Sequence, residues 1–156
     1  MSKTVADSHS GNASSSSPTI LVVEDEPMVR MLLAESLRDA GYHVLEAGNA
    51  AGAIATLHGA PSVDLVFSDV RMPGELDGFG LARWIKRHAP EMRVLLTSGW
   101  PGEGCSSNRC LDAPLVSKPY SQRQLIDLID SLLQRQPRLA CGPHAATQSG
   151  WPRVIL

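Results

Sequence analysis

Side chains that could bind a metal or a phosphate follow four short apolar runs of the sequence. The pair Glu24-Asp25 follows the first run, Asp69 ends the third, Thr97 ends the fourth, and Lys118 follows the last. Because functional groups of parallel sheets gather at the carboxyl ends of the strands, we expect these side chains to converge at one edge. Three carboxylates repel one another unless a cation offsets their charge, and Mg²⁺ prefers such oxygen ligands.

The same residue types suit the transfer of a phosphoryl group. The Asp69 carboxylate could act as a nucleophile that forms an acyl phosphate. Lys118 could hold a phosphate oxygen opposite the metal, and Thr97 could donate a hydrogen bond to another. Taken singly, an acid after a strand is usually a solvated turn or a helix cap, and a lysine is usually a surface cation. Their joint placement at several strand ends favours a functional site.

The elements that must position these residues alternate between strand and helix. Five strands are predicted, at residues 19–23, 42–47, 63–69, 93–97 and 115–117. Helices are predicted after Pro27, after a capping Asn49, from Phe79 and after a capping box formed by Ser121 and Gln124. This alternation predicts an α/β fold, a three-layer sandwich with a parallel sheet covered on both faces.

The two ends of the sequence differ in composition from the middle. Residues 1–17 are rich in serine and predict a disordered leader, and residues 136–156 predict a flexible tail. Residues 18–135 remain as one domain. After Leu133 the chain holds three arginines and no acid, whereas the middle is acidic. Residues 151–156 (WPRVIL) could be a partner-binding peptide, although a disordered end is the simpler interpretation.

Composition excludes several classes of protein. The net charge of −2 gives no general reason to expect DNA or membrane binding, and 43% apolar residues are ordinary for a globular chain. The sequence has no apolar stretch long enough for a signal peptide or a membrane span. Three cysteines without metal-binding spacing indicate free thiols in a reducing cytoplasm, which is the predicted location.

Four linked motifs make the sequence resemble the receiver domain of two-component response regulators. They occur in the expected order across residues 18–135. The matching segments are ILVVEDE (20–26), FSDVRMPG (67–74) with DG at 77–78, VLLTSG (94–99) and SKPY (117–120).

The resemblance implies a flavodoxin-like strand order, 2-1-3-4-5, with about five helices. It implies that Asp69 is the phosphoacceptor and that Thr97 and Lys118 hold the phosphoryl group. It also implies that Mg²⁺ is the cofactor. The implied metal ligands are Glu24, Asp25, Asp69 and the backbone carbonyl of Arg71.

Two departures from the family pattern concern the switch rather than the phosphorylation site. Leu115 stands where many relatives have an aromatic residue that rotates on activation. Residues 100–112, where the fourth helix is expected, contain proline, glycine and paired serines, which predicts a short or irregular helix. We therefore predict a switch that orders the 100–113 segment.

These inferences predict a single-domain response regulator that accepts a phosphoryl group from a sensor histidine kinase or a phosphotransfer protein. Its output is predicted to be contact with another protein, without direct binding to DNA or membranes. We expect a receiver that catalyses its own phosphorylation and dephosphorylation, not an enzyme in the usual sense.

Two other classes of protein use some of the same residue types. A metal-dependent phosphatase with an Asp nucleophile would need a general acid, commonly an Asp two residues further on, where this chain has Arg71. A binding domain that has lost the phosphoryl chemistry would not need the complete set of acids, threonine and lysine.

Overall fold

The computed structural model describes residues 17–60, 62–99 and 113–134. Within these ranges lie five strands and four helices. In chain order they are β1 (Thr19–Val23), α1 (Pro27–Asp39), β2 (His43–Ala47), α2 (Ala50–Gly59), β3 (Leu65–Asp69), α3 (Gly78–His88), β4 (Arg93–Ser98), β5 (Leu115–Ser117) and α5 (Gln122–Gln134). Four predictions lie outside the described residues: the fourth helix, the ordering of the 100–113 segment up to residue 112, the leader before Ser17 and the tail after residue 135.

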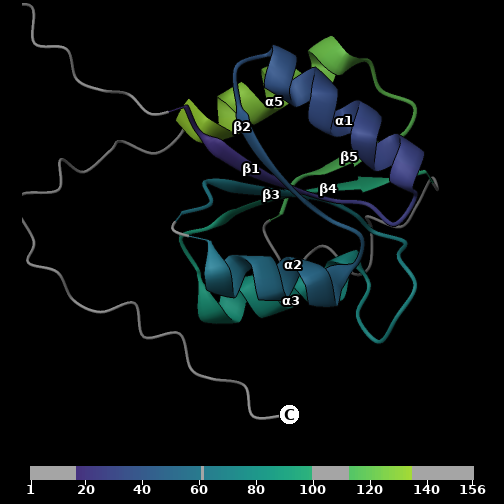
Figure 1. Cartoon of the computed structure of the whole chain (residues 1–156), viewed down its shortest axis with the longest axis vertical. Coiled ribbons are helices and arrows are strands. Elements are labelled where there is room, and N and C mark those ends of the chain that lie inside the picture. The colour runs from purple at the N-terminus through teal and green to yellow at the C-terminus, as the bar shows by residue number, and fades with distance from the viewer. Residues whose placement is uncertain (1–16, 61, 100–112, 135–156) are drawn as a thin grey trace, which may run out of the picture.

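All five strands run parallel in one sheet of order β2-β1-β3-β4-β5. Helices α1 and α5 cover one face of the sheet, and α2 and α3 cover the other (Figure 1). This confirms the predicted three-layer sandwich and its flavodoxin-like strand order. The first four strands are joined in turn through α1, α2 and α3, because a parallel pair needs a crossover connection.

The sheet is apolar on both faces, and alternate residues of each strand pack against the helices on opposite faces. In β1, Ile20 and Val22 pack toward α1 and α5, whereas Leu21 and Val23 pack toward α2 and α3. This is why the strands read as continuous apolar runs, as expected for a sheet buried on both sides. Each fully buried Leu, Ile or Val contributes about 1.5–3 kcal/mol.

Local sequence signals determine where most helices begin. Pro27 is the first residue of α1. The Asn49 side chain accepts a hydrogen bond of 2.7 Å from Gly52 N and caps α2. At α5, Ser121 N donates to Gln124 Oε1 at 2.9 Å and Gln124 N donates to Ser121 Oγ at 3.2 Å, so the predicted capping box is confirmed.

Three strand boundaries differ from the prediction. β3 begins at Leu65, two residues later than predicted. Here the Asp64 carboxylate accepts a hydrogen bond of 2.7 Å from Thr19 N. A side-chain oxygen thus takes the place of the backbone carbonyl that would pair with Thr19 N in a regular strand. β2 begins at His43 rather than at residue 42, and β4 continues to Ser98.

The residue before β2 ties two distant parts of the fold together. The buried Tyr42 donates a hydrogen bond from its hydroxyl to the Asp130 carboxylate on α5. Burial, then the hydrogen bond and the charge of Asp130, raise the pKa of the Tyr42 phenol. The bond therefore holds α5 against the β1–β2 side of the sheet.

Candidate functional site

The polar residues singled out in the sequence meet at the carboxyl edge of the sheet. Four of them lie on the same side of the sheet, toward α1 and α5, because each follows by two positions a core residue of that face. The core residues are Val22, Phe67, Leu95 and Val116, and the polar residues are Glu24, Asp69, Thr97 and Lys118. Strand alternation therefore brings the four side chains together.

Three carboxylates form the acidic part of the site. Glu24, Asp25 and Asp69 each offer an oxygen, and these oxygens all lie within 4.8 Å of one another. Glu24 is buried, Asp69 is partly buried and Asp25 is exposed. Burial is the largest cause that raises the pKa of Glu24; nearby Asp69 also raises it, whereas Lys118 lowers it. Three such oxygens can hold a divalent cation.

Lys118 balances part of this negative charge. Its Nζ lies 3.0 Å from Asp69 Oδ2 and 3.3 Å from Glu24 Oε2. Burial alone would lower the pKa of Lys118, but hydrogen bonds and the charges of Asp69 and Glu24 outweigh it, so the net shift is upward. Together, three ionised carboxylates and one ammonium carry a charge of −2, which a divalent cation would neutralise.

Thr97 faces the site from β4, in register with Asp69 of β3. Thr97 is 1% exposed, and among the described residues its hydroxyl is the one buried side-chain polar atom that makes no hydrogen bond. Burial raises the pKa of the neighbouring Tyr120 phenol, and the nearby Thr97 hydroxyl lowers it in part, but the two oxygens do not meet hydrogen-bond geometry. A buried hydroxyl without a partner costs about 1–3 kcal/mol, so an anion placed here would gain a donor.

The loop after Asp69 is held by hydrogen bonds from backbone N–H groups that the sequence did not predict. Asp77 Oδ1 accepts a hydrogen bond of 2.7 Å from Gly80 N and caps α3, which therefore begins at Gly78 rather than at Phe79. Gly78 N donates to Val70 O at 2.8 Å. An Asp before an apolar helical pattern was the available sign of this cap.

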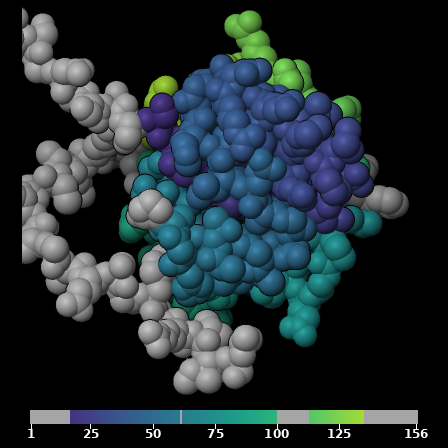
Figure 2. Space-filling model, in the orientation of Figure 1, coloured from purple at the N-terminus to yellow at the C-terminus, as the bar shows by residue number. Residues whose placement is uncertain are grey.

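A β carbon at Gly78 would lie 2.1 Å from the Asp69 carbonyl oxygen, closer than any side chain allows. Glycine at position 78 thus permits the backbone of α3 to touch the backbone of Asp69. Arg71, whose carbonyl the family resemblance assigns to the metal, begins this exposed loop. Figure 2 shows the loop in teal, projecting from the body of the molecule.

Arg30 of α1 is a second contributor that the sequence did not indicate. Its Nη1 donates a hydrogen bond of 2.6 Å to the backbone carbonyl of Glu24. Its Nε lies 3.7 Å from the Glu46 carboxylate at the end of β2. Arg30 thereby fixes the turn that presents the Glu24-Asp25 pair.

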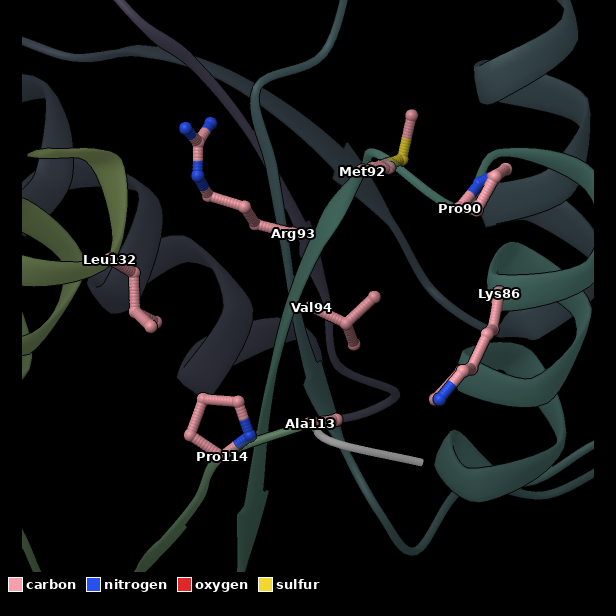
Figure 3. Close-up of a pocket in the computed structure, with 9 residues that line it drawn as sticks. Lys86, Pro90, Met92, Arg93, Val94, Ala113, Pro114 and Leu132 are labelled. Carbon is pink, nitrogen blue, oxygen red and sulfur yellow. The ribbon is translucent and has the colours of Figure 1, made fainter. Parts of the chain in front are cut away.

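A separate cavity of about 270 Å³ lies away from this site (Figure 3). It opens beside the first residues of β4, Arg93 and Val94, with Lys86 of α3 reaching in from one side. Thr97 lies at the other end of the same strand. None of the described residues of the acidic site lines this cavity, so it is not part of the site.

Comparisons with known proteins agree with the geometry. A family model described as "Response regulator receiver domain" matches residues 20–130. The response regulator receiver protein CpdR of Brucella abortus is 34% identical over 116 residues, which cover 73% of this chain and 95% of CpdR. The sensor kinase CckA of the same organism is 35% identical over 125 residues, which cover 78% of this chain but only 13% of CckA.

A solved structure extends the likeness to three dimensions. The response regulator TrrA of Thermotoga maritima, in complex with Mg²⁺ and BeF, superposes with a TM-score of 0.67 at 29% identity. The match covers 74% of this chain and 98% of that one. These comparisons do not support the phosphatase alternative. In the described part of the chain, no helix is both long enough and apolar enough to cross a membrane.

Proposed function

Since this chain belongs to the response regulator receiver family of two-component systems, we propose that it accepts a phosphoryl group on Asp69. The donor is a sensor histidine kinase or a phosphotransfer protein. One observation carries the proposal: the Asp69 carboxylate lies among two further acids, 3.0 Å from the Lys118 ammonium and in register with the unpaired hydroxyl of Thr97.

The residues at the site fit Mg²⁺. Carboxylate oxygens of Glu24, Asp25 and Asp69 would hold the ion. The family resemblance implies the backbone carbonyl of Arg71 as a further ligand. When bound, Mg²⁺ would neutralise the phosphate oxygens during transfer. The TrrA complex with Mg²⁺ supports this choice of cation through the family likeness.

The chain's own residues then have distinct roles in the transfer. One Asp69 oxygen attacks phosphorus, so an O–P bond to the carboxylate forms as the bond to the donor's imidazole nitrogen breaks. The electron pair of that bond stays on the nitrogen, and the donor histidine is regenerated. Lys118 Nζ leaves Asp69 to hold a phosphoryl oxygen, and Thr97 donates its free hydrogen bond to another.

We assign the receiver to residues 18–135 and propose that it works in the cytoplasm as a stand-alone domain, without direct DNA contact. Support comes from CpdR, of which the chain covers 95%. The output would be a change of protein–protein contacts. Slow self-catalysed loss of the phosphoryl group would reset the protein, which we do not regard as an enzyme in the usual sense.

Intact mass measurement after incubation with Mg²⁺ and acetyl phosphate tests the proposal. The protein should gain one phosphoryl mass, and Asp69→Asn should gain none. Glu75→Gln, in the exposed loop after β3, is the matched control and should be labelled normally. Labelling of the Asn variant, or labelling that persists in excess chelator, would refute the assignment.

A further inference from the structure

An apolar groove of about 400 Å³ runs between α1 and α5, on the face of the sheet that these two helices cover (Figure 1). Its walls are Val29, Leu32 and Leu33 of α1 and Leu125 and Ile126 of α5. Apolar exposure continues beyond the groove along α1, where Met28, Met31 and Leu32 are 60%, 43% and 57% exposed. Contiguous apolar surface of this kind marks an interaction site.

The two helices that wall the groove carry a slight net negative charge. Together α1 and α5 hold four carboxylates and three cations, a net charge of −1. Residues 135–156 hold three arginines and no acid, a net charge of +3. The chain that follows α5 is therefore opposite in charge to the helices that wall the groove, which favours contact between them.

The same following chain also supplies apolar side chains. Its last six residues are Trp151-Pro-Arg-Val-Ile-Leu, with one aromatic and three aliphatic side chains around Arg153. A large aromatic side chain with one polar atom suits a groove that is apolar with few polar groups. Those polar groups include Gln122 and Ser36, whose side chains are hydrogen-bonded to each other across the groove.

The connecting chain is long enough. α5 ends at Gln134, and it is 13 residues long, about 20 Å at 1.5 Å per residue. The groove lies along the first half of α5, and 16 residues separate Gln134 from Trp151. Sixteen residues span at most about 55 Å, so residues 151–156 reach the groove without displacing α5. Tethering makes the contact intramolecular, so a modest affinity suffices.

We infer that residues 151–156 bind in the groove between α1 and α5 of the same molecule, with Trp151 among Leu32, Leu33 and Ile126. The bound segment covers the exposed apolar part of α1. A protein partner that uses this face must first displace it. The contact is therefore autoinhibitory for that face.

Fluorescence of the full chain tests this inference. Trp84→Phe and Trp100→Phe together leave Trp151 as the sole tryptophan, since the chain has three. The probe is acrylamide quenching of Trp151, with a synthetic peptide of residues 146–156 as the exposed reference. We expect Trp151 in the protein to be quenched several-fold less than in the peptide, with emission shifted to the blue.

Leu32→Asp, added to this background, places a carboxylate in the wall at an exposed position and should return quenching to the peptide value. Leu76→Asp is the matched control, an exposed leucine in the loop after β3 that is not part of the groove, and it should change nothing. Circular dichroism verifies that both variants are folded.

Three results would overturn the inference: Trp151 as exposed as in the peptide, protection that survives Leu32→Asp, or protection that is lost on dilution. The last would indicate a contact between two copies of the chain. None of these readouts depends on phosphorylation, so failure here leaves the proposed function standing, and failure of acetyl phosphate labelling leaves this contact standing.

Discussion

Replacing Gly78 by alanine should displace the phosphoacceptor Asp69, although Gly78 has no side chain that contacts the site. The added β carbon would lie 2.1 Å from the Asp69 carbonyl oxygen and 2.7 Å from Val70 Cα. Both are backbone atoms, so no flexible side chain can move aside. Reaching an ordinary contact of 3.4 Å requires a shift of about 1.3 Å between the start of α3 and the end of β3.

The shift has an energetic and a catalytic cost. Overpacking costs about 1–3 kcal/mol, and loss of the 2.8 Å bond from Gly78 N to Val70 O adds about 1 kcal/mol. We therefore expect Gly78→Ala to lower the free energy of unfolding by about 2–4 kcal/mol. Because misplacement of a reacting group by about 1 Å can cost about 100-fold in rate, phosphorylation of Asp69 should slow at least tenfold.

Urea unfolding and the rate of labelling by acetyl phosphate measure the two effects, at a temperature where circular dichroism shows the variant folded. Gly59→Ala is the matched control. Gly59 ends α2, has negative φ, and an added β carbon there would meet nothing within 4 Å. It should stabilise the protein by up to about 1 kcal/mol and leave the rate unchanged. A Gly78→Ala protein with normal stability and a normal rate would show that this backbone contact is not needed.

Three further substitutions probe the charge, the unpaired hydroxyl and the pH dependence. Lys118→Met leaves the acids, including buried Glu24, without their cation, so in the absence of metal the free energy of unfolding should fall by about 1–3 kcal/mol. Mg²⁺ should restore part of this loss. Thermal unfolding with and without Mg²⁺ measures the effect, and a variant whose stability does not respond to the metal would contradict the expectation. Thr97→Val removes the unpaired buried hydroxyl and should stabilise the unphosphorylated protein by about 1–2 kcal/mol while slowing its labelling; a loss of stability in urea would mean that the hydroxyl has a partner. Tyr42→Phe should cost about 1.5–3 kcal/mol at neutral pH because the bond to the Asp130 carboxylate is lost. The folded-state pKa of Tyr42 is raised above its ordinary value of 10.0, so the wild-type advantage should be complete below that pH and shrink as the pH rises beyond it, and a gap between the two proteins that stays constant in alkaline urea titrations would refute this.

Much of the fold was predictable because its signals are local. The predicted bounds of β1 and β5 were correct, and Pro27, Asn49 and Ser121 marked three helix starts. The strand order followed from the family resemblance, and the observed sheet confirms it. Alternation within strands then makes convergence of the site residues a geometric consequence.

What the sequence did not predict depends on contacts between distant residues. The salt bridge of Arg30 to Glu46 and its bond to the Glu24 carbonyl join three elements that no single window contains. The sequence offered Asp77-Gly78 only as part of a family motif, and packing against the Asp69 backbone explains why position 78 has no side chain. The start of β3 was wrong because the Asp64 side chain enters the pairing with Thr19.

The strand alternation that puts Asp69, Thr97 and Lys118 on one side of the sheet also determines where the gene tolerates length changes. One extra codon within β3 would turn Asp69 toward α2 and α3, away from Thr97 and Lys118, even if the strand still formed. One codon between α3 and β4, at the opposite edge, alters neither the parity of a strand nor the site. Variants with one residue inserted in a loop at the amino edge of the sheet should therefore still be phosphorylated. Variants with one apolar residue inserted within a strand should not be phosphorylated, even though the strand remains apolar.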